Sequence, residues 1–203
     1  QVTAPRRANR SSCQTPEVRI SSSTLTGNAS GVYVGGTAAL AMDHTLVHGN
    51  TNHGFHGIGG SANLQYNTFV ANGGSGVFAD GVSFTLQNSI LASNSYGVQS
   101  NDYGVPRTLS HNDVWSNSRT NYSGVNEGPN SLSANPLFIS ASDFHLQSTS
   151  PCRRVSSAGT DLGALPYENT VVASVEVIPG NVTVDAAEST PCIARAYNSA
   201  GSP

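Results

Sequence analysis

The sequence predicts an all-β protein built as a solenoid of stacked coils, each 22 to 23 residues long. Apolar residues recur at that period, and asparagine recurs in the same register. Glycine, asparagine and serine fill the stretches between short apolar clusters, and the chain has no lysine and only one methionine, so helix formers are scarce. Stacked coils would turn each cluster into a parallel sheet with neighbouring strands about 4.8 Å apart, and would bury columns of like side chains.

Four columns define the repeat. Two are apolar: Ile20, Met42, Leu64, Leu86, Leu109 and Leu132, and then Leu25, Val47, Phe69, Leu91, Val114 and Leu137. The third is Asn28, Asn50, Asn72, Asn94 and Asn117. A weaker fourth column is Tyr33, Phe55, Val77, Gln99 and Tyr122, in which Val98 is the candidate apolar residue at the break. A leucine-rich repeat has a similar period but needs three leucine positions within a few residues, which these coils lack.

The asparagine column has a predicted structural role. We expect each of these asparagines to take the left-handed conformation at a tight turn and to bond its amide to the amides one coil away, as in stacked amide ladders. A glycine follows soon after in each period, at Gly31, Gly54, Gly76, Gly97 and Gly124. Glycine tolerates the positive φ that a sharp corner demands, and we assign it that role.

Composition excludes some partners. The formal net charge of -3, with charged residues at 10 %, provides no basic patch for a phosphate backbone. No stretch approaches the roughly 20 apolar residues of a membrane helix, so we expect no transmembrane segment. The cysteines Cys13, Cys152 and Cys192 allow at most one disulfide, and three free thiols are an equal alternative. Because the chain starts with Gln1, we expect a fragment or a processed product.

The coils from about residue 18 to 140 resemble right-handed parallel β-helix repeats of the broad pectate-lyase-like superfamily. The stretches Asn135–Phe138, Asp143–Leu146, Ser150–Cys152 and Asp161–Ala164 are similar to the C-terminal end of bacterial surface β-helices of the choice-of-anchor type. Asn135 stands where that pattern has Asp, and Arg153-Arg154 departs from the usual run. The resemblance implies a right-handed parallel β-helix and export to the cell surface or the medium.

A second resemblance begins downstream. Residues 172–179 and 182–184, in which Val175 alternates with Val177 and Val182 with Val184, look like the opening of a bacterial Ig-like domain of group 2. About 100 residues are needed for such a sandwich, so the segment would be incomplete and its hairpin marginal alone. We therefore divide the chain into an N-terminal segment 1–17, a β-helix with a C-terminal cap over 18–167, and a linker with an incomplete Ig-like start over 168–203.

Asp80 and Asp102 are the weak candidates for chemistry. They are 22 residues apart, which predicts the same position in adjacent coils and carboxylates about 5 Å apart. Such a pair suits Ca²⁺, the one candidate cofactor, or the acid and nucleophile of a retaining glycosidase. Both also lie beside turn residues, where Asp caps backbone amides. Arg107, in the same coil as Asp102, is either part of this site or half of a surface ion pair.

Four histidines, His44, His48, His53 and His56, fall within one coil, but a coil circles the whole cross-section, so a shared metal site is not favoured. His53 and His56 alone are expected near each other across a corner. Trp115 follows an inward position and should point outward, either to stack on a sugar or to be covered by residues 117–129, which is the favoured alternative.

The predicted function is a scaffold or contact module for polysaccharide or cell-surface glycan, located outside the cell or on its surface. Outward positions such as Ser21, Gln65, Gln87 and Ser110 are uncharged, with Asp43 the exception, and this favours the scaffold. The alternative is a polysaccharide lyase or glycoside hydrolase whose active site lies partly outside these coils. Nothing in the sequence indicates an oligomeric state.

Overall fold

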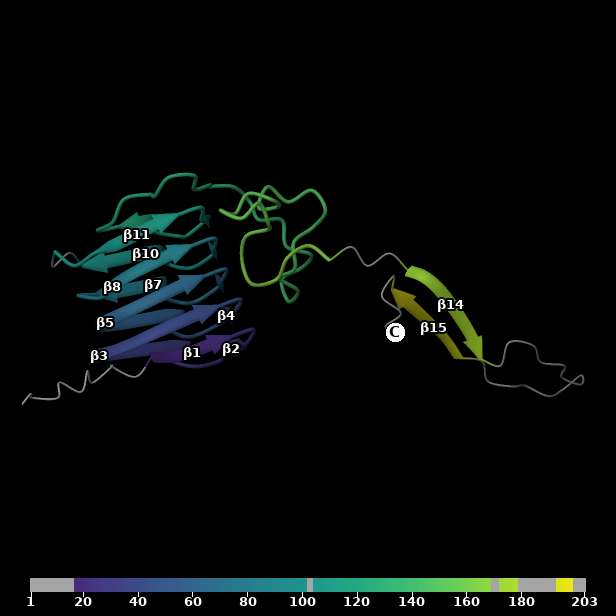
Figure 1. Cartoon of the computed structure of the whole chain (residues 1–203), viewed down its shortest axis with the longest axis horizontal. Helices are drawn as coiled ribbons and strands as arrows, with labels where there is room; N and C mark the ends of the chain where they lie inside the picture. The colour runs from purple at the N-terminus through teal and green to yellow at the C-terminus, as the bar shows by residue number, and fades with distance from the viewer. Residues whose placement is uncertain (1–16, 102–103, 169–171, 179–192, 199–203) are drawn as a thin grey trace, which may run out of the picture. The chain divides into compact units, whose positions relative to one another are not determined.

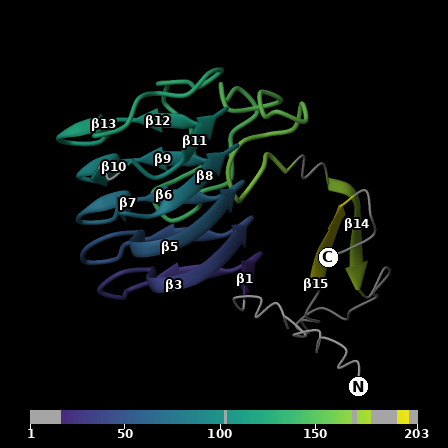
Figure 2. The same ribbon diagram turned by 60° about the vertical axis from the view of Figure 1, so that its left-hand side comes forward.

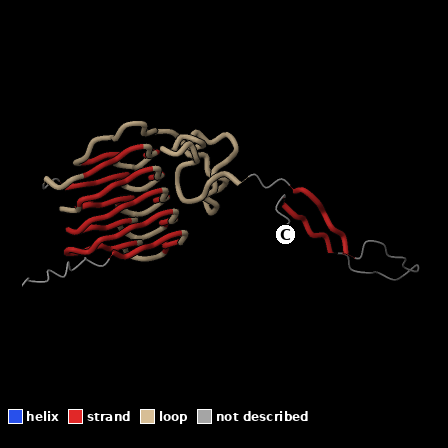
Figure 3. Tube along the Cα trace, in the orientation of Figure 1, coloured by secondary structure: helices blue, strands red, loops and turns tan. Residues whose placement is uncertain are grey.

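The structure is a computed structural model that describes residues 17–101, 104–168, 172–178 and 193–198. Within these ranges all regular structure is β-strand and no helix occurs (Figure 3). The chain divides into two compact units, Gln1–Tyr167 and Glu168–Pro203. The first unit is a parallel β-solenoid, so the predicted all-β coil architecture is confirmed.

Each coil of the first unit has three sides (Figures 1 and 2). Side 1 is a five-stranded sheet of three-residue strands: β2 (Thr24–Thr26), β4 (Leu46–His48), β6 (Thr68–Val70), β9 (Ile90–Ala92) and β12 (Asp113–Trp115). Sides 2 and 3 belong to one eight-stranded sheet, and β3 (Val32–Asp43) and β5 (Phe55–Gln65) run through both. Side 2 also contains β7 (Ser75–Asp80), β10 (Tyr96–Asn101) and β13 (Thr120–Ser123); side 3 also contains β1 (Glu17–Ser21), β8 (Ser83–Gln87) and β11 (Arg107–Ser110).

The two main apolar columns are confirmed over five coils. The parallel register pairs Ile20, Met42, Leu64, Leu86 and Leu109 in succession on side 3. On side 1 it pairs Leu25, Val47, Phe69, Leu91 and Val114. Leu64, Leu86, Phe69 and Leu91 are fully buried, as predicted, because each meets both neighbours of its column inside the coil.

The predicted sixth members of these columns are wrong. Leu132 bridges to Asp113 on side 1 and accepts a hydrogen bond at its carbonyl from the Val114 amide, so it does not stack on Leu109. Leu137 lies in a loop with a φ of 53° and continues no column. The coil after β12 leaves the repeat: residues 124–130 cross the end of the stack, where Pro129 accepts a hydrogen bond from the His111 amide.

The fourth column is shifted by one residue at two places. On side 2 the register pairs Val32, Phe55, Val77, Val98 and Tyr122, so Val98 supplies the apolar side chain as expected. Val32 takes the inward position that the sequence assigned to Tyr33, and Tyr33 faces solvent. Turns of unequal length precede these strands, and a one-residue change of turn moves a side chain to the opposite face of a strand.

Single residues with positive φ turn the chain at both ends of every side-1 strand. Before the strand stand Ser22, His44, Tyr66, Asn88 and His111, with φ of 45° to 56°; after it stand Gly27, Gly49, Ala71, Ser93 and Ser116, with φ of 52° to 72°. The ladder asparagines come one residue after the second set and are not left-handed. That part of the prediction is wrong, because the preceding residue already makes the corner.

The asparagine ladder itself is confirmed. The Oδ1 atom of Asn72 accepts hydrogen bonds from the backbone nitrogen (3.2 Å) and the Nδ2 atom (2.9 Å) of Asn50. The Nδ2 atom of Asn72 donates to Asn94 Oδ1 (3.0 Å) and to the carbonyl oxygen of Val47 (3.1 Å). The same pattern links Asn94 to Asn117. Each buried amide therefore satisfies groups in both adjacent coils.

The glycine column has a different cause from the one predicted. Of its members Gly124 alone has positive φ, and Gly31, Gly54, Gly76 and Gly97 are needed for space. A Cβ added at Gly54 would lie 2.6 Å from the Gly76 carbonyl oxygen, 2.8 Å from the Phe69 ring and 3.1 Å from Asn72 Nδ2. These glycines thus let the next coil and its ladder asparagine approach closely.

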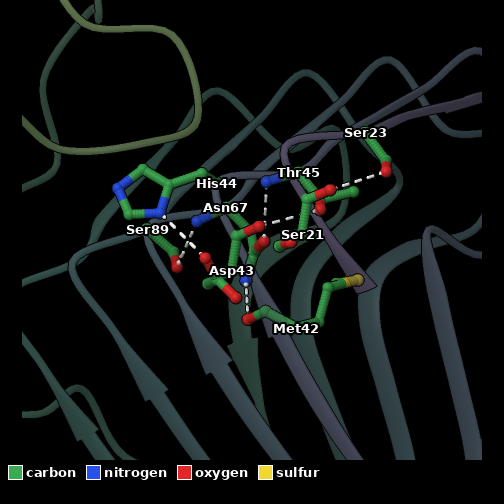
Figure 4. Close-up of polar contacts among 8 residues, drawn as sticks. All are labelled: Ser21, Ser23, Met42, Asp43, His44, Thr45, Asn67 and Ser89. Carbon is green, nitrogen blue, oxygen red and sulfur yellow. Dashed lines mark hydrogen bonds and ion pairs between the residues drawn. The ribbon is translucent and has the colours of Figure 1, made fainter. Parts of the chain in front are cut away.

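A second polar ladder, not predicted from the sequence, lies at the corner between sides 3 and 1 (Figure 4). The backbone nitrogen of Thr45 donates to Asn67 Oδ1 (3.0 Å), and that of Asn67 donates to Ser89 Oγ (3.1 Å). The Nδ2 atom of Asn67 donates to the Met42 carbonyl oxygen at 2.9 Å. The ladder continues from Ser89 to Asn112 Oδ1. This column contains serine, threonine and asparagine, so its period appears only when these residues are grouped by their ability to form hydrogen bonds.

Residues 134–167, here the covering segment, pack against the outer surface of side 1. Phe144, Leu146 and Leu162 are buried together with outward residues of side 1 such as Val70 and Ile90. Asp143 begins this contact by accepting a hydrogen bond from the His145 amide (3.1 Å), with His145 Nδ1 at 2.7 Å from the same oxygen. These bonds lower the pKa of Asp143. Phe144 and Leu146, on either side of His145, are both buried in the contact with side 1.

The contact contains a buried carboxyl group. Asp113 has no exposed surface; its Oδ1 accepts a hydrogen bond from the Ala134 amide (3.0 Å), and its Oδ2 lies 3.2 Å from the Cys152 sulfur. Burial is the main cause that raises the pKa of Asp113, and burial together with Asp113 raises the pKa of Cys152. Cys152 is a free, buried thiol, while Cys13 and Cys192 lie outside the described residues.

A pH dependence follows from Asp113. The pKa of Asp113 in the folded chain is above the usual 3.8, so the folded state binds the carboxyl proton more tightly than the unfolded state does. The protonated carboxyl group therefore stabilises the fold, and this stabilisation is lost as pH rises from about 3.8 through the raised pKa. We expect the unfolding free energy of Asp113→Asn, minus that of the unchanged chain, to increase over this window. Urea unfolding at several pH values measures the difference, with exposed Asp43→Asn as the control; a flat difference contradicts the prediction.

The second unit contains one antiparallel pair, β14 (Val172–Ile178) with β15 (Ile193–Asn198). The alternating stretch at residues 175–177 therefore lies on a strand, as its period indicates. The predicted strand at residues 182–184 lies outside the described residues. The pair is a β-ribbon, and the Ig-like interpretation of this segment stays a prediction.

Candidate functional site

Of the predicted acidic pair, the structure describes Asp80. Asp80 of β7 is paired with Asn101 of β10, and Asn101 Nδ2 donates to Asp80 Oδ1 at 3.3 Å. The local step is 21 residues, since Val77 pairs with Val98, and the predicted pairing of Asp80 with Asp102 stays a prediction. Asp102 itself lies outside the described residues. Among the residues that are described, no group of three or more His, Cys, Asp and Glu side chains is placed to hold a metal ion.

Arg107 occupies an inward position that was not anticipated. The register places Val18, Leu40, Ala62, Phe84 and Arg107 in one inward column of side 3. At the end of the stack, Arg107 Nη1 donates to Ser100 Oγ and to the Gly124 carbonyl oxygen, both at 3.0 Å. Arg107 thus fastens the chain segment that crosses the last coil, and it lines the hollow described below.

The four histidines are dispersed, except for one pair. His44 stacks on Tyr66 with ring centroids 5.0 Å apart, and His48 contacts Phe144 of the covering segment. The rings of His53 and His56 are 5.0 Å apart, which confirms their predicted proximity. His53 Nδ1 accepts a hydrogen bond from the Ser75 amide at 3.0 Å, so the proton of the neutral ring is on Nε2. Burial, and then the neighbouring His56, lower the pKa of His53.

Trp115 is half-buried at the end of β12. Its backbone carbonyl accepts hydrogen bonds from the Asn117 amide side chain and from the Ser93 backbone. The side chain is outward from the inward residue Val114, in agreement with the alternation of the strand.

The outer surface of side 3 is a shallow groove that runs along the stack. Its floor consists of small or uncharged outward residues in consecutive coils: Ala39, Ser61 and Ser83 in one row, and Ala41, Asn63, Thr85 and Thr108 in the next. Two hollows of about 300 and 240 Å³ share Asn63, and the second shares Thr108 with a third of about 780 Å³ at the last coil. The first two hollows are therefore neighbours on side 3, whereas the third lies at the end of the stack, between Arg107, Leu109 and residues 124–128.

Few residues carry charge in this groove, and one of them is Asp43, which lines the same hollow as Arg19 and Asn63. Glu17 and Arg19 form an ion pair of 2.6 Å on β1, and Arg107 with Glu127 lines the hollow at the other end. One edge carries the predicted polar row: Gln65 Nε2 donates to Asn63 Oδ1 (3.0 Å), and Gln87 Nε2 donates to Ser110 Oγ (3.0 Å). Ser110 is buried rather than exposed, because Gln87 and the end of the stack cover it. The groove offers many hydrogen-bonding groups and little charge.

Side 2 carries aromatic residues on its outer surface, and the sequence analysis missed their common face. Tyr33, His56 and Phe78 are paired in consecutive strands, with ring centroids 5.1 and 5.3 Å apart. Period-two alternation from the inward residues Val32, Phe55 and Val77 is the signal that identifies them. It was obscured because Tyr33 was placed in the inward column.

Within the described part of the chain no helix has the length and apolar character to span a membrane. Residues 8–140, about two-thirds of the chain, match the family model for the right-handed β-helix region. The search of curated proteins and the search of solved structures gave no match. The match includes every coil strand of the three-sided stack, from β1 to β13. By its stacked parallel coils and by this match over most of its length, the chain belongs to the right-handed β-helix family.

Proposed function

We propose that this protein is a non-catalytic contact module for an extended, neutral polysaccharide, which it binds along side 3 while outside the cell or on its surface. The pair of neighbouring hollows on side 3 carries this proposal. A shallow groove with few charges, lined by hydroxyl and amide groups, suits a chain of sugar rings, whose edges present hydroxyl groups and whose net charge is zero. Rigid stacked coils hold these groups in place before the ligand arrives, which lowers the ordering cost of binding.

The position of the covering segment also favours side 3 as the binding face. Side 1 is occupied by residues 134–167, whose Phe144 and Leu146 bury its outward side chains. Side 3 has no such cover among the described residues, and its outward residues line hollows instead. Asn63 belongs to two of the hollows and is exposed, so it lies at the centre of the proposed contact.

Calorimetry with soluble hexasaccharides of cellulose, xylan and mannan, and with oligogalacturonate as an acidic chain, tests the proposal. We expect a neutral chain to bind, and Thr85→Arg, which fills the groove from its floor, to weaken that binding by about tenfold or more, equivalent to roughly 1.4 kcal/mol. Thr51→Arg places the same side chain at an exposed corner between sides 1 and 2 and should bind as the unchanged chain does. Equal affinities for the two variants, or no binding of any probe, would overturn the proposal.

A further inference from the structure

Side 2 presents a row of aromatic rings on the outside of the coils, here the aromatic row: Tyr33, His56 and Phe78, with His53 beside them. His53 stacks on Phe78 with centroids 4.8 Å apart and planes at 16°, while His56 meets both rings at steep angles. His53, His56 and Phe78 contact one another, and Tyr33 contacts His56, so the rings are held more rigidly than isolated surface side chains, because each limits the rotamers of its neighbours.

Tyr33 is the most exposed member, with 61 % of its surface accessible. Its ring lies over Gly35 of the same strand: a Cβ at Gly35 would be 3.0 Å from Tyr33 Cε1 and 3.2 Å from the hydroxyl oxygen. Because glycine has no side chain, the ring rests on the backbone and its opposite face points outward. Ile58, paired with Gly35 in the next strand and 44 % exposed, extends this apolar surface.

One histidine of the row is held in its neutral form, and polar groups lie at the edges of the row. The hydrogen bond from the Ser75 amide fixes the His53 tautomer and keeps that ring uncharged near neutral pH, since protonation of Nδ1 would remove the bond. Gln99 continues the outward positions on β10 and hydrogen-bonds to Ser75 Oγ at 2.9 Å. The first outward carboxyl group is Asp80, which is paired with Ile58 at the end of the row.

The size of the row distinguishes between possible occupants. A stable protein interface buries about 800 Å² on each partner and twenty or more residues. The row offers four rings and one aliphatic side chain, with Gly35 under the Tyr33 ring and Gly36 and Gly59 at the bend beside it. An exposed ring face with hydrogen-bonding groups at its edges matches one or two sugar rings, whose C–H face stacks on an aromatic and whose rim carries hydroxyl groups.

We propose that the aromatic row is a second glycan site, which stacks pyranose rings whose two faces both carry axial C–H groups only, as in β-linked glucose and xylose. This deepens and rests on the proposed function, because it names the sugar class that the module prefers. The row lies across the glycine bend of β3 and β5 from the groove, on the same strands. Mannose, whose axial hydroxyl interrupts one face, should stack less well at Tyr33.

Saturation-transfer NMR and calorimetry with cellohexaose, xylohexaose and mannohexaose test the inference. We expect saturation of sugar C–H protons from the Tyr33 ring, and a loss of about fivefold to tenfold in affinity for cellohexaose in Tyr33→Ala. Tyr33→Phe should keep most of the affinity, because the ring face remains. Ile139→Ala, a truncation of an exposed apolar residue on the covering segment, is the matched control and should change nothing.

The outcomes separate this site from the groove. If Thr85→Arg weakens binding while Tyr33→Ala does not, the aromatic row is not a glycan site and the groove remains one. If Tyr33→Ala weakens binding and Thr85→Arg does not, the row stands and the groove proposal fails. Equal affinity for mannohexaose and cellohexaose in the unchanged chain overturns the preference for an all-axial C–H face.

Discussion

Replacing Asn72 with alanine is expected to lower the free energy of unfolding by about 3 kcal/mol, near the upper end for a buried polar group left without its partner. Asn72 is 2 % exposed, and its side chain accepts two hydrogen bonds from Asn50 and donates to Val47 and Asn94. Truncation leaves groups of two other coils unpaired in a place that water does not reach. Urea unfolding followed by circular dichroism measures the loss.

Asn52→Ala is the matched control for this measurement. Asn52 is exposed and lies in the same coil as the ladder asparagine Asn50, two residues after it. Its loss should change the unfolding free energy by less than about 0.5 kcal/mol, as for most surface substitutions. Similar values for the two variants would show that the ladder does not stabilise the coil stack.

Gly54→Ala is expected to destabilise the chain by about 2 to 3 kcal/mol, although it adds only one methyl group. The φ of Gly54 is not positive, so the cost comes from space: the new Cβ would meet the Gly76 carbonyl oxygen at 2.6 Å and the Phe69 ring at 2.8 Å. Both belong to the next coil, which would have to move away along the stack. Thermal unfolding measures the effect.

Gly27→Ala separates backbone strain from crowding. Gly27 has a φ of 72° and no atom within 4 Å of an added Cβ, so alanine should cost only about 1 kcal/mol through its left-handed conformation. A larger cost at Gly27 than at Gly54 would mean that φ, and not the approach of the next coil, selects glycine in the column.

The inward columns from Ile20 to Leu109 were predictable because every coil repeats the same contact. Because all members of a column make the same contact, the period of the column can be recognised even where one coil carries a polar residue. The end of the repeat was not predictable in this way. Leu132 keeps the period of its column, yet the chain has already moved to side 1, where it pairs with Asp113. Spacing alone does not distinguish a further coil from a segment that keeps the spacing of the repeat without forming a coil.

The outward surfaces were less accessible to sequence reasoning. Asp80 and Asp102 are one period apart, but the local step on side 2 is 21 residues, so Asn101 stands opposite Asp80. A shift of one residue exchanges inward for outward positions on a strand, and turn lengths decide it. The docking of the covering segment depends on tertiary contacts such as that of Cys152 with Asp113, 39 residues away, which no period announces.

The hydrogen bonds of the asparagine ladder repeat from coil to coil, so a coil can be added or removed without changing the ladder. Asn50 reaches forward to Asn72, and Asn72 reaches back to Val47 and forward to Asn94, so each 22-residue length brings one acceptor for the coil before it and one donor for the coil after it. Duplicating or deleting one whole length preserves the hydrogen bonds of this ladder at the new junction. The number of coils can therefore change by whole coils, in evolution or by engineering. An insertion of a few residues within a strand would instead shift the register of the ladder.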